Sequence, residues 1–275
     1  MRNGKDRLRI GIVGCGAIGS RIALSTKKEL KSRFMVSALY DIDCQKSRTL
    51  AQRLNKPSLV KPSIQETIHS SDIVVEAVNT SATRDIVRQA ISLKRSVLAM
   101  SVGRLLGQSR LFSLAEKNHC SLLMPSGAIA GLDAVKAASL AGIKKMTLTT
   151  RKPPQGFADN PYLRDKGISL KDVKEETVVF DGPVHEAVRY FPQNINVAAA
   201  LSMAAGDSVE VKVRIIASPD VSRNTHEIVL EGPFGRITTR TENEICPDNP
   251  KTSYLAVLSG VQTLKQFYQH VKIGT

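Results

Sequence analysis

The sequence predicts an α/β fold, a doubly wound parallel sheet followed by a second α/β domain with a mixed sheet. Nearly continuous apolar runs alternate with helical segments over the first 125 residues, which is typical of parallel strands buried on both faces. Strands that alternate apolar and polar residues come only after residue 205, and they indicate a sheet with one covered face. The chain has 275 residues, 42% of them hydrophobic, which is enough for two domains with separate cores.

The first apolar run leads into a glycine turn and then a helix. Gly14, Gly16 and Gly19 fit the pattern G-x-G-x-x-G. The first glycine allows the tight turn, the second lets the backbone approach a pyrophosphate, and the third lets the helix pack closely on the strand. Free N–H groups at the start of such a helix favour phosphate. The predicted dinucleotide contacts in this turn are Gly14, Gly16, Ala17 and Ile18.

The second apolar run, Phe34–Tyr40, ends in an Asp-Ile-Asp sequence. In a Rossmann unit an acid at the end of the second strand binds the adenosine ribose hydroxyls; Asp41 is the better candidate and Asp43 the second. The acid would repel a 2′-phosphate and so favours NAD over NADP, while Lys46 and Arg48 weaken that preference. The cofactor is therefore NAD or NADP. The alternative is a glycine turn in another kind of βα unit, with acids that only shape the turn.

A third apolar run, Asp72–Val78, continues the alternation and ends in a polar turn. Loops at the carboxyl edge of a parallel sheet line the cofactor crevice, so Asn79 and Thr80 are candidate contacts of the nicotinamide ribose. Alternatively, Thr80 or Ser81 caps the helix that follows, and the two roles could hold at once. The remaining elements expected in this part are helices at 17–30, 44–55, 63–69, 82–93 and 111–118 and strands at 96–100 and 120–124.

The pattern changes after residue 125, where a run of small residues, Ser126–Gly131, follows the end of a strand. We expect a first domain of residues 1–125 together with 249–275 and a second domain of residues 126–248. The last helix, 254–271, carries apolar residues at helical spacing and should pack on the first domain. The second domain is expected to contain helices at 132–140, 183–191 and 194–205 and strands at 145–150, 177–180, 209–215, 225–231 and 236–241.

Charge and composition limit the partners that the chain could have. The net charge is +14, and residues 1–125 hold 21 Lys and Arg against 9 Asp and Glu, so the excess lies in the first domain. A positive field would attract a dinucleotide and a dicarboxylate, although a solvated basic surface explains the excess as well. Trp is absent and aromatic residues make up 4%, so the stacking platform of a nucleic-acid-binding protein is not expected. No apolar run reaches about 18 residues, and we expect no membrane segment.

The cysteine and histidine residues limit which metal sites and catalytic groups the chain could have. Four scattered cysteines without a C-x-x-C pair suit a reducing cytoplasm and offer no metal-site spacing. A nicotinamide enzyme needs a group that moves protons, and histidine titrates near neutrality. Among five histidines, His226 starts a strand of the second domain and shares a face with Ile228 and Leu230. From the residues alone, a structural role for His226 is favoured over a catalytic one.

Five motifs occur in a fixed order along the chain. They are the glycine turn, SGAIAGLDA from Ser126, FPQNINVAA from Phe191, NTHE from Asn224 and NPKTS from Asn249. With these motifs the chain resembles the L-aspartate dehydrogenase family over nearly its whole length. The resemblance implies a Rossmann domain plus an α/β domain, usually dimeric. It also implies oxidation of L-aspartate with NAD or NADP to iminoaspartate, which hydrolyses to oxaloacetate and ammonia and can feed NAD synthesis.

The resemblance also implies roles for single residues. The catalytic histidine of the family matches His226, which would act as general acid and base on the amine and on the water that attacks the imine. From the residues themselves, Lys251 could pair with a substrate carboxylate, could act as the base in place of His226 if burial lowered its pKa, or could be a surface lysine before a helix. The implied cofactor contacts are Ala130 and Asn196, with Ala128 and Asn194 as neighbouring alternatives. The expected substrate contacts are Ser126, Asn194, Lys251 and Thr252, and no metal is expected.

Three other interpretations fit the chain less well. Enzymes of the dihydrodipicolinate-reductase type share the two-domain plan, but their His-His pair followed by lysine is missing from this sequence. Sugar dehydrogenases carry Glu-Lys-Pro where this chain has Ser101–Arg104. A non-catalytic NAD sensor that acts on nucleic acid could use the positive charge, but no helix-turn-helix pattern is visible outside the Rossmann unit.

Overall fold

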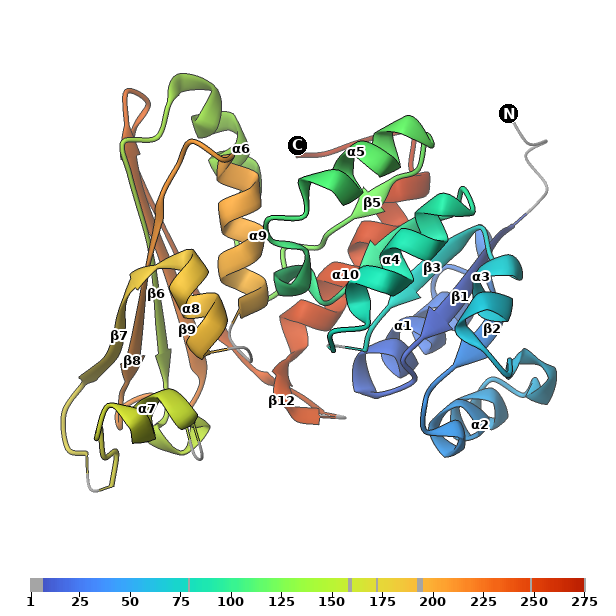
Figure 1. Cartoon of the computed structure of the whole chain (residues 1–275), viewed down its shortest axis with the longest axis horizontal. Coiled ribbons are helices and arrows are strands. Elements are labelled where there is room, and N and C mark those ends of the chain that lie inside the picture. The colour runs from blue at the N-terminus through green and yellow to red at the C-terminus, as the bar shows by residue number, and fades with distance from the viewer. Residues whose placement is uncertain are drawn as a thin grey trace. The chain divides into compact units, whose positions relative to one another are not determined.

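The computed structural model describes residues 7–78, 80–157, 160–171, 173–191, 195–247 and 249–274, with only the backbone described at Ile195 and at 249–251. The chain forms two compact units (Figure 1). The first unit contains residues 1–125 and Val257–Val271, and the second contains Ser126–Ala256 and the last residues from Lys272. The return to the first unit therefore begins at Val257, whereas we expected it at residue 249.

The first unit is built on a five-stranded sheet with the order β2-β1-β3-β4-β5, in which every pair of neighbours is parallel. Because β1 lies between β2 and β3, the chain reverses its winding direction at β1, and ligands of such sheets bind at that point of the carboxyl edge. The strands are β1 (Leu8–Val13), β2 (Phe34–Tyr40), β3 (Ile73–Glu76), β4 (Ser96–Ala99) and β5 (Leu122–Leu123).

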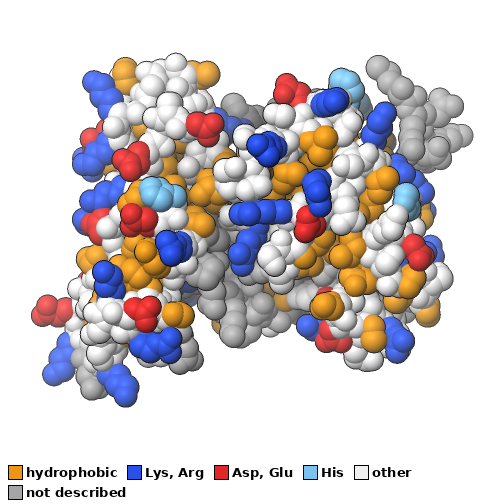
Figure 2. All heavy atoms as spheres, in the orientation of Figure 1, with side chains coloured by type: hydrophobic (Ala, Val, Ile, Leu, Met, Phe, Trp, Pro, Cys, Tyr) orange, Lys and Arg blue, Asp and Glu red, His pale blue; other side chains and the backbone are white. Residues whose placement is uncertain are grey.

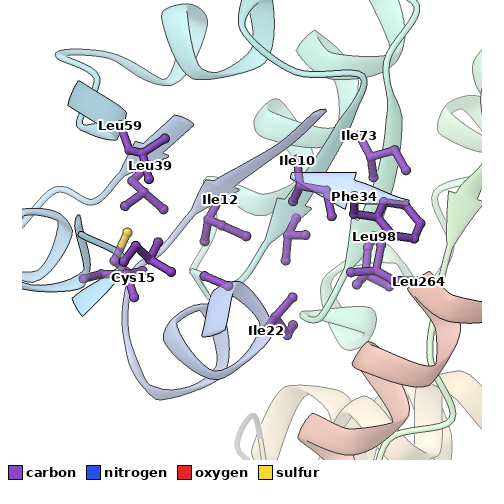
Figure 3. Close-up of a cluster of buried hydrophobic side chains, with 14 of the residues drawn as sticks. Ile10, Ile12, Cys15, Ile22, Phe34, Leu39, Leu59, Ile73, Leu98 and Leu264 are labelled. Atoms are coloured by element: carbon purple, nitrogen blue, oxygen red, sulfur yellow. The ribbon is translucent and has the colours of Figure 1, made fainter. Parts of the chain in front are cut away.

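Helices cover both faces of this sheet, because alternate strand residues point to opposite sides. On one side Ile10 and Ile12 of β1 pack with Ile22 of α1 and Leu264 of α10, as Figure 3 shows. On the other side Val13 packs in a second cluster with residues of three helices. The helices of this unit are α1 (Ala17–Lys28), α2 (Cys44–Arg53), α3 (Ile64–His69), α4 (Thr83–Ser92), α5 (Ser109–Lys117) and α10 (Tyr254–Tyr268). Short 3₁₀ turns lie at η1 (Pro57–Leu59) and η2 (Val102–Leu105).

The second unit is built on a mixed sheet with the order β10-β9-β6-β8-β7. Only the central pair β6 and β8 is parallel, and the other neighbours are antiparallel. The hairpin between β9 and β10 closes over two residues, since Gly232 pairs with Gly235. The strands are β6 (Lys145–Lys152), β7 (Thr177–Pro183), β8 (Val211–Ala217), β9 (Asn224–Gly232) and β10 (Gly235–Asn243).

One face of the mixed sheet is covered by helices, and Figure 1 shows α6, α8 and α9 along that side. A small cavity marks the contact, where Thr150 of β6 and Ile215 of β8 face Ala187 of α8 and Ala198 of α9. The other face carries charged residues, among them Arg214 and Asp181, which form an ion pair. The remaining elements are α6 (Leu132–Ala141), η3 (Pro154–Phe157), α7 (Pro161–Asp165), α8 (Val184–Tyr190), α9 (Ile195–Ala205), β11 (Ile245–Cys246) and β12 (Asn249–Ser253).

The predicted fold class is confirmed, and so are most of the elements. Strand 34–40 is observed with the predicted bounds, and Ser63 caps α3 by accepting a hydrogen bond from the N–H of Glu66. Helix α7 and the pair β11 and β12 were not anticipated, because they are short and lie in loop-like sequence rich in Pro and Asn. None of the helices in the described part of the chain is long and apolar enough to cross a membrane. On the face shown in Figure 2, Lys and Arg side chains are interspersed with hydrophobic and neutral groups.

Candidate functional site

The glycine turn after β1 has the geometry that its motif requires. Gly14 has φ +97°, and a Cβ atom there would lie 2.5 Å from the carbonyl oxygen of Ala77. A Cβ atom at Gly19 would collide with the carbonyl oxygen of Gly14, so α1 packs closely on the turn only with glycine there. A Cβ atom at Gly16 would meet nothing within 4 Å. The turn is therefore constrained by backbone contacts on one side and open at Gly16, where a pyrophosphate would approach.

The start of α1 offers backbone donors to such a group. Gly16 occupies the N-cap position, and no side chain caps the helix there. The first helical residues, Ala17 and Ile18, are partly buried. Uncapped N–H groups at a helix start attract anions, so this turn fits the diphosphate of a dinucleotide.

Asp41 lies directly beside the glycine turn. Its Oδ2 accepts a hydrogen bond of 2.7 Å from the N–H of Cys15, and its Oδ1 accepts one of 2.9 Å from the N–H of Asp43. The carboxylate is therefore held by two backbone donors at the end of β2, where an adenosine ribose would bind. Asp43, the second candidate, has another role, because its Oδ1 caps α2 by accepting a hydrogen bond from the N–H of Gln45. Burial and the Asp41 charge raise the pKa of the Cys15 thiol to about 12.

A buried acid at the end of β3 was not anticipated. Glu76 is 0% exposed, and its two carboxylate oxygens accept four hydrogen bonds. The donors are the N–H of Val78, the hydroxyl of Thr83, and both the N–H and the hydroxyl of Ser101, at 2.8–3.1 Å. Glu76 thus accepts hydrogen bonds from both turns, the one after β3 and the one after β4, at the carboxyl edge of the sheet. An acid inside an otherwise apolar strand was the sequence signal that could have revealed it.

The turn after β3 was expected to contact the nicotinamide ribose. Asn79 lies outside the described residues. Thr80 is exposed, and its hydroxyl accepts a hydrogen bond of 3.3 Å from the N–H of Ala82. Ala82 is itself the N-cap residue of α4 and no side chain caps that helix, so the alternative role of Thr80 as the helix cap is not observed. Within the first unit, the residues that fit a dinucleotide are thus the glycine turn and Asp41.

In the second unit, His226 lies on the face of the mixed sheet that the helices cover. It pairs directly with Thr150 of β6, and the hydroxyl of Thr150 lies 3.0 Å from Nδ1 of the imidazole. His226 is 5% exposed. Burial, and to a smaller extent the charge of Lys152, lower the pKa of His226 to about 3. The imidazole is therefore neutral near pH 7, and its Nδ1 is engaged by the Thr150 hydroxyl.

The small-residue segment 126–131 is attached to the hairpin that carries His226. The hydroxyl of Thr241, which lies opposite His226, donates a hydrogen bond of 2.9 Å to the carbonyl oxygen of Ala128. The Asn243 amide donates to the same oxygen at 3.1 Å, and the Thr239 hydroxyl donates to Ala130 at 3.2 Å. Three polar side chains of β10 thus hold the segment by its carbonyl groups.

The same segment also approaches α9. A Cβ atom at Gly127 would lie 3.6 Å from a methyl group of Val197, in the first turn of that helix, and Asn196 is the residue before it. The structure therefore brings the predicted residues Ala130, Asn196 and His226 into one region of the second unit. Ala130 is exposed and Asn196 is partly buried.

Only some of the predicted substrate contacts lie in the described part of the chain. Ser126 is partly buried at the start of the small-residue segment, and Thr252 is partly buried on β12. Asn194 and the side chain of Lys251 lie outside the described residues. In the part of the chain that the structure describes, no group of three or more His, Cys, Asp and Glu side chains could hold a metal ion.

Lys152 is the functional candidate that the sequence did not single out. It is the last residue of β6, two positions after Thr150, and it is partly buried. Burial lowers the pKa of its ammonium group to about 8. Its charge also acts on the pKa of His226, so the two groups lie within electrostatic reach. A lysine after alternating strand residues resembles a surface residue in sequence, and no pattern distinguished it.

Two family models match the chain, one on each part. "Homoserine dehydrogenase, NAD binding domain" matches residues 14–125, and "Aspartate dehydrogenase, C-terminal" matches residues 133–267. Among solved structures, aspartate dehydrogenase from Thermotoga maritima covers 98% of this chain and 100% of its own, with a TM-score of 0.74 and 23% identity. A homoserine dehydrogenase from Thiobacillus denitrificans covers 95% of this chain and 73% of its own, with a TM-score of 0.62 and 15% identity. These likenesses establish the fold, including a nicotinamide-nucleotide-binding domain.

Curated relatives are similar over their full length. L-aspartate dehydrogenase of Methanosarcina barkeri is 46% identical over 271 residues, which cover 98% of this chain and 100% of the relative. L-aspartate dehydrogenase of Methanococcoides burtonii is 41% identical over 274 residues, with the same coverage. The resemblance inferred from the motifs is thereby confirmed: this chain belongs to the L-aspartate dehydrogenase family of oxidoreductases.

Proposed function

We propose that this chain oxidises L-aspartate with a nicotinamide dinucleotide to iminoaspartate, which hydrolyses to oxaloacetate and ammonia. The observation that carries the proposal is the buried, neutral His226 beside Thr150, next to the small-residue segment and the first turn of α9. The relatives named L-aspartate dehydrogenase support the choice of substrate, because their similarity extends over both units.

The reaction needs a hydride acceptor and a proton acceptor. When bound, the nicotinamide ring supplies the acceptor for the hydride that leaves Cα of aspartate. His226 takes the proton that the amine loses, through Nε2, while Thr150 fixes the ring by its contact with Nδ1. The imidazole is neutral near pH 7, so it has a nitrogen lone pair with which to accept this proton. Water then adds to the imine carbon, and the protonated imidazole returns its proton to the nitrogen that leaves as ammonia.

Cofactor preference follows from Asp41. We infer that NAD is used in preference to NADP, because the carboxylate is held by the N–H groups of Cys15 and Asp43 at the ribose position. A 2′-phosphate would bring further negative charge against this fixed acid. Lys46 lies 3.7 Å from the Asp43 carboxylate, so this nearby cation is engaged by the neighbouring acid.

We also propose a homodimer in the cytoplasm, with a product that can feed NAD synthesis. The dimer rests on the family resemblance, and the cytoplasmic location on cysteine usage, since Cys15, Cys44, Cys120 and Cys246 are free thiols. Light scattering on the purified protein tests the dimer, with a mass of about twice 29.9 kDa expected.

The activity is tested by mixing the purified protein with oxaloacetate, ammonium and NADH and following the nicotinamide absorbance, and then repeating the assay with NADPH. We expect ammonium-dependent loss of the signal, and a faster rate with NADH. Protein that binds NADH but shows no ammonium-dependent oxidation would contradict the proposed substrate.

A further inference from the structure

We propose that Lys152 binds a carboxylate of the dicarboxylic substrate beside His226. This role rests on the proposed function, and it adds a substrate-binding residue to it. Lys152 suits this role by its position on the sheet, by its partly buried side chain and by the neutral state of the neighbouring His226.

The strand geometry places Lys152 and His226 at the same end and on the same face of the mixed sheet. Thr150 and His226 lie directly opposite each other on β6 and β9, so their side chains share a face. Lys152 is two residues after Thr150, and strand residues two apart point to the same side. This is the face covered by helices, on which Thr150 borders α8 and α9.

The backbone at Lys152 is fixed. Lys152 pairs with Ala217 at the end of β8, and its carbonyl oxygen accepts a hydrogen bond of 2.9 Å from the N–H of Ser218. A lysine on a rigid strand end presents its ammonium group from a defined place, although its stem is flexible. The adjacent Arg151 points to the other face, where its Nε donates a hydrogen bond of 2.9 Å to Glu176.

A substrate with two carboxylates needs a positively charged group near His226. L-aspartate and oxaloacetate each carry two carboxylates, and His226 is neutral near pH 7, so it provides no positive charge for either. The Lys152 side chain is partly buried, and an anion paired with its ammonium group there interacts more strongly than at an open surface. A bound carboxylate would also favour the charged form of the lysine, so binding and charge support each other.

The test compares three variants with the unmodified protein: Lys152→Met, Lys152→Arg and the control Lys145→Met. Lys145 lies at the other end of β6 and is exposed. The measurements are KM and kcat for oxaloacetate with ammonium, the dissociation constant of NADH, and calorimetric binding of succinate to the NADH-loaded protein. Circular dichroism and thermal unfolding confirm that each variant is folded.

For Lys152→Met we expect KM for oxaloacetate to rise about 100-fold and succinate binding to be lost, as for removal of one partner of a shielded charge pair. NADH binding should change by less than about twofold, because Lys152 is not among the residues expected to contact the dinucleotide. Lys152→Arg should recover part of the binding, since the charge is kept. Lys145→Met should match the unmodified protein.

Two results would overturn the proposal. The first is a folded Lys152→Met variant with unchanged KM and succinate affinity, whether or not kcat falls. The second is recovery of kcat by added methylamine at unchanged KM, which would assign proton transfer to Lys152 instead. Succinate binding needs no turnover, so its loss in Lys152→Met would support the role of Lys152 even if oxaloacetate were not a substrate.

Discussion

The hydroxyl oxygen of Thr150 and Nδ1 of His226 lie 3.0 Å apart, although the two residues are 76 positions apart in the sequence. They lie on the antiparallel strands β6 and β9. The contact joins the centre of the mixed sheet to the strand that carries the NTHE motif. Because Nδ1 is engaged by the hydroxyl, this contact restricts the orientation of the ring. The strand pairing and the Thr150 side chain thus both position the histidine.

Removal of that hydroxyl should slow the reaction without affecting the cofactor. Thr150→Val keeps the shape of the side chain but leaves Nδ1 without its partner, so the ring loses its fixed orientation. We expect kcat to fall about tenfold, in line with a hydrogen bond of about 1–2 kcal/mol. Steady-state kinetics measures this, and Thr149→Val, on the opposite face of the same strand, is the control. Equal kcat in Thr150→Val and the unmodified protein would show that the contact has no role in orientation.

His226 itself should be needed for turnover and dispensable for cofactor binding. His226→Ala removes the proton acceptor, and it leaves in place the glycine turn, Asp41, Ala130 and Asn196, which are the residues expected to contact the dinucleotide. We expect kcat to fall at least about 100-fold, as for the loss of a general base, with unchanged NADH affinity. Fluorescence titration with NADH and initial rates provide the measurements. A variant that keeps nearly the full rate would contradict the assignment.

The burial of His226 should make the protein sensitive to acid. The pKa of His226 is about 3 in the folded protein, and a solvated histidine has a pKa of about 6.5, so the unfolded chain binds more protons between these values. The free energy of unfolding should therefore fall as the pH drops from about 6.5 to about 3, by at most about 1.4 kcal/mol per pH unit from this group. Thermal unfolding across that range should show a weaker pH dependence in His226→Gln. The same slope in both proteins would mean that other groups cause it.

Asp41 should set the choice between the two nicotinamide dinucleotides. Asp41→Ala removes the fixed negative charge at the ribose position, so the repulsion of a 2′-phosphate and the hydroxyl contacts are lost together. We expect the ratio of kcat/KM for NADPH to that for NADH to rise at least about tenfold, which is about 1.4 kcal/mol. Asp43→Ala is a matched control, since it removes a neighbouring acid that caps α2. Its ratio should stay unchanged while stability falls by about 1 kcal/mol. Equal ratios in both variants would remove Asp41 from cofactor selection.

Glu76 should be important for the stability of the carboxyl edge of the parallel sheet. Glu76→Gln replaces an oxygen that accepts hydrogen bonds with an NH₂ group, so at least one of its four buried donors loses its partner. We expect the free energy of unfolding to fall by about 1–3 kcal/mol in urea titrations. Glu66→Gln, at an exposed site on α3, should be close to neutral. A Glu76→Gln variant as stable as the unmodified protein would show that the amide satisfies the same donors.

Local sequence patterns were sufficient for most of the elements and for the cofactor turn. The glycine spacing determines which residues can turn after β1, because Gly14 has a positive φ and no room for a side chain. The acid after β2 is likewise a local feature, and the structure places Asp41 on the N–H of Cys15. Such features depend on a few neighbouring residues, and they are visible in the sequence for that reason.

The sequence by itself thus determined the fold class, the glycine turn, Asp41 and the histidine of the NTHE motif as a candidate. Only the tertiary structure decided that Thr150 contacts this histidine, that Lys152 lies on the same face, and that Glu76 accepts hydrogen bonds from the turns after β3 and β4. These contacts are made between residues that lie 2 to 76 positions apart in the sequence, and they depend on strand pairing and on burial of the side chains. Register and desolvation arise only when the strands assemble, so no local pattern could encode them.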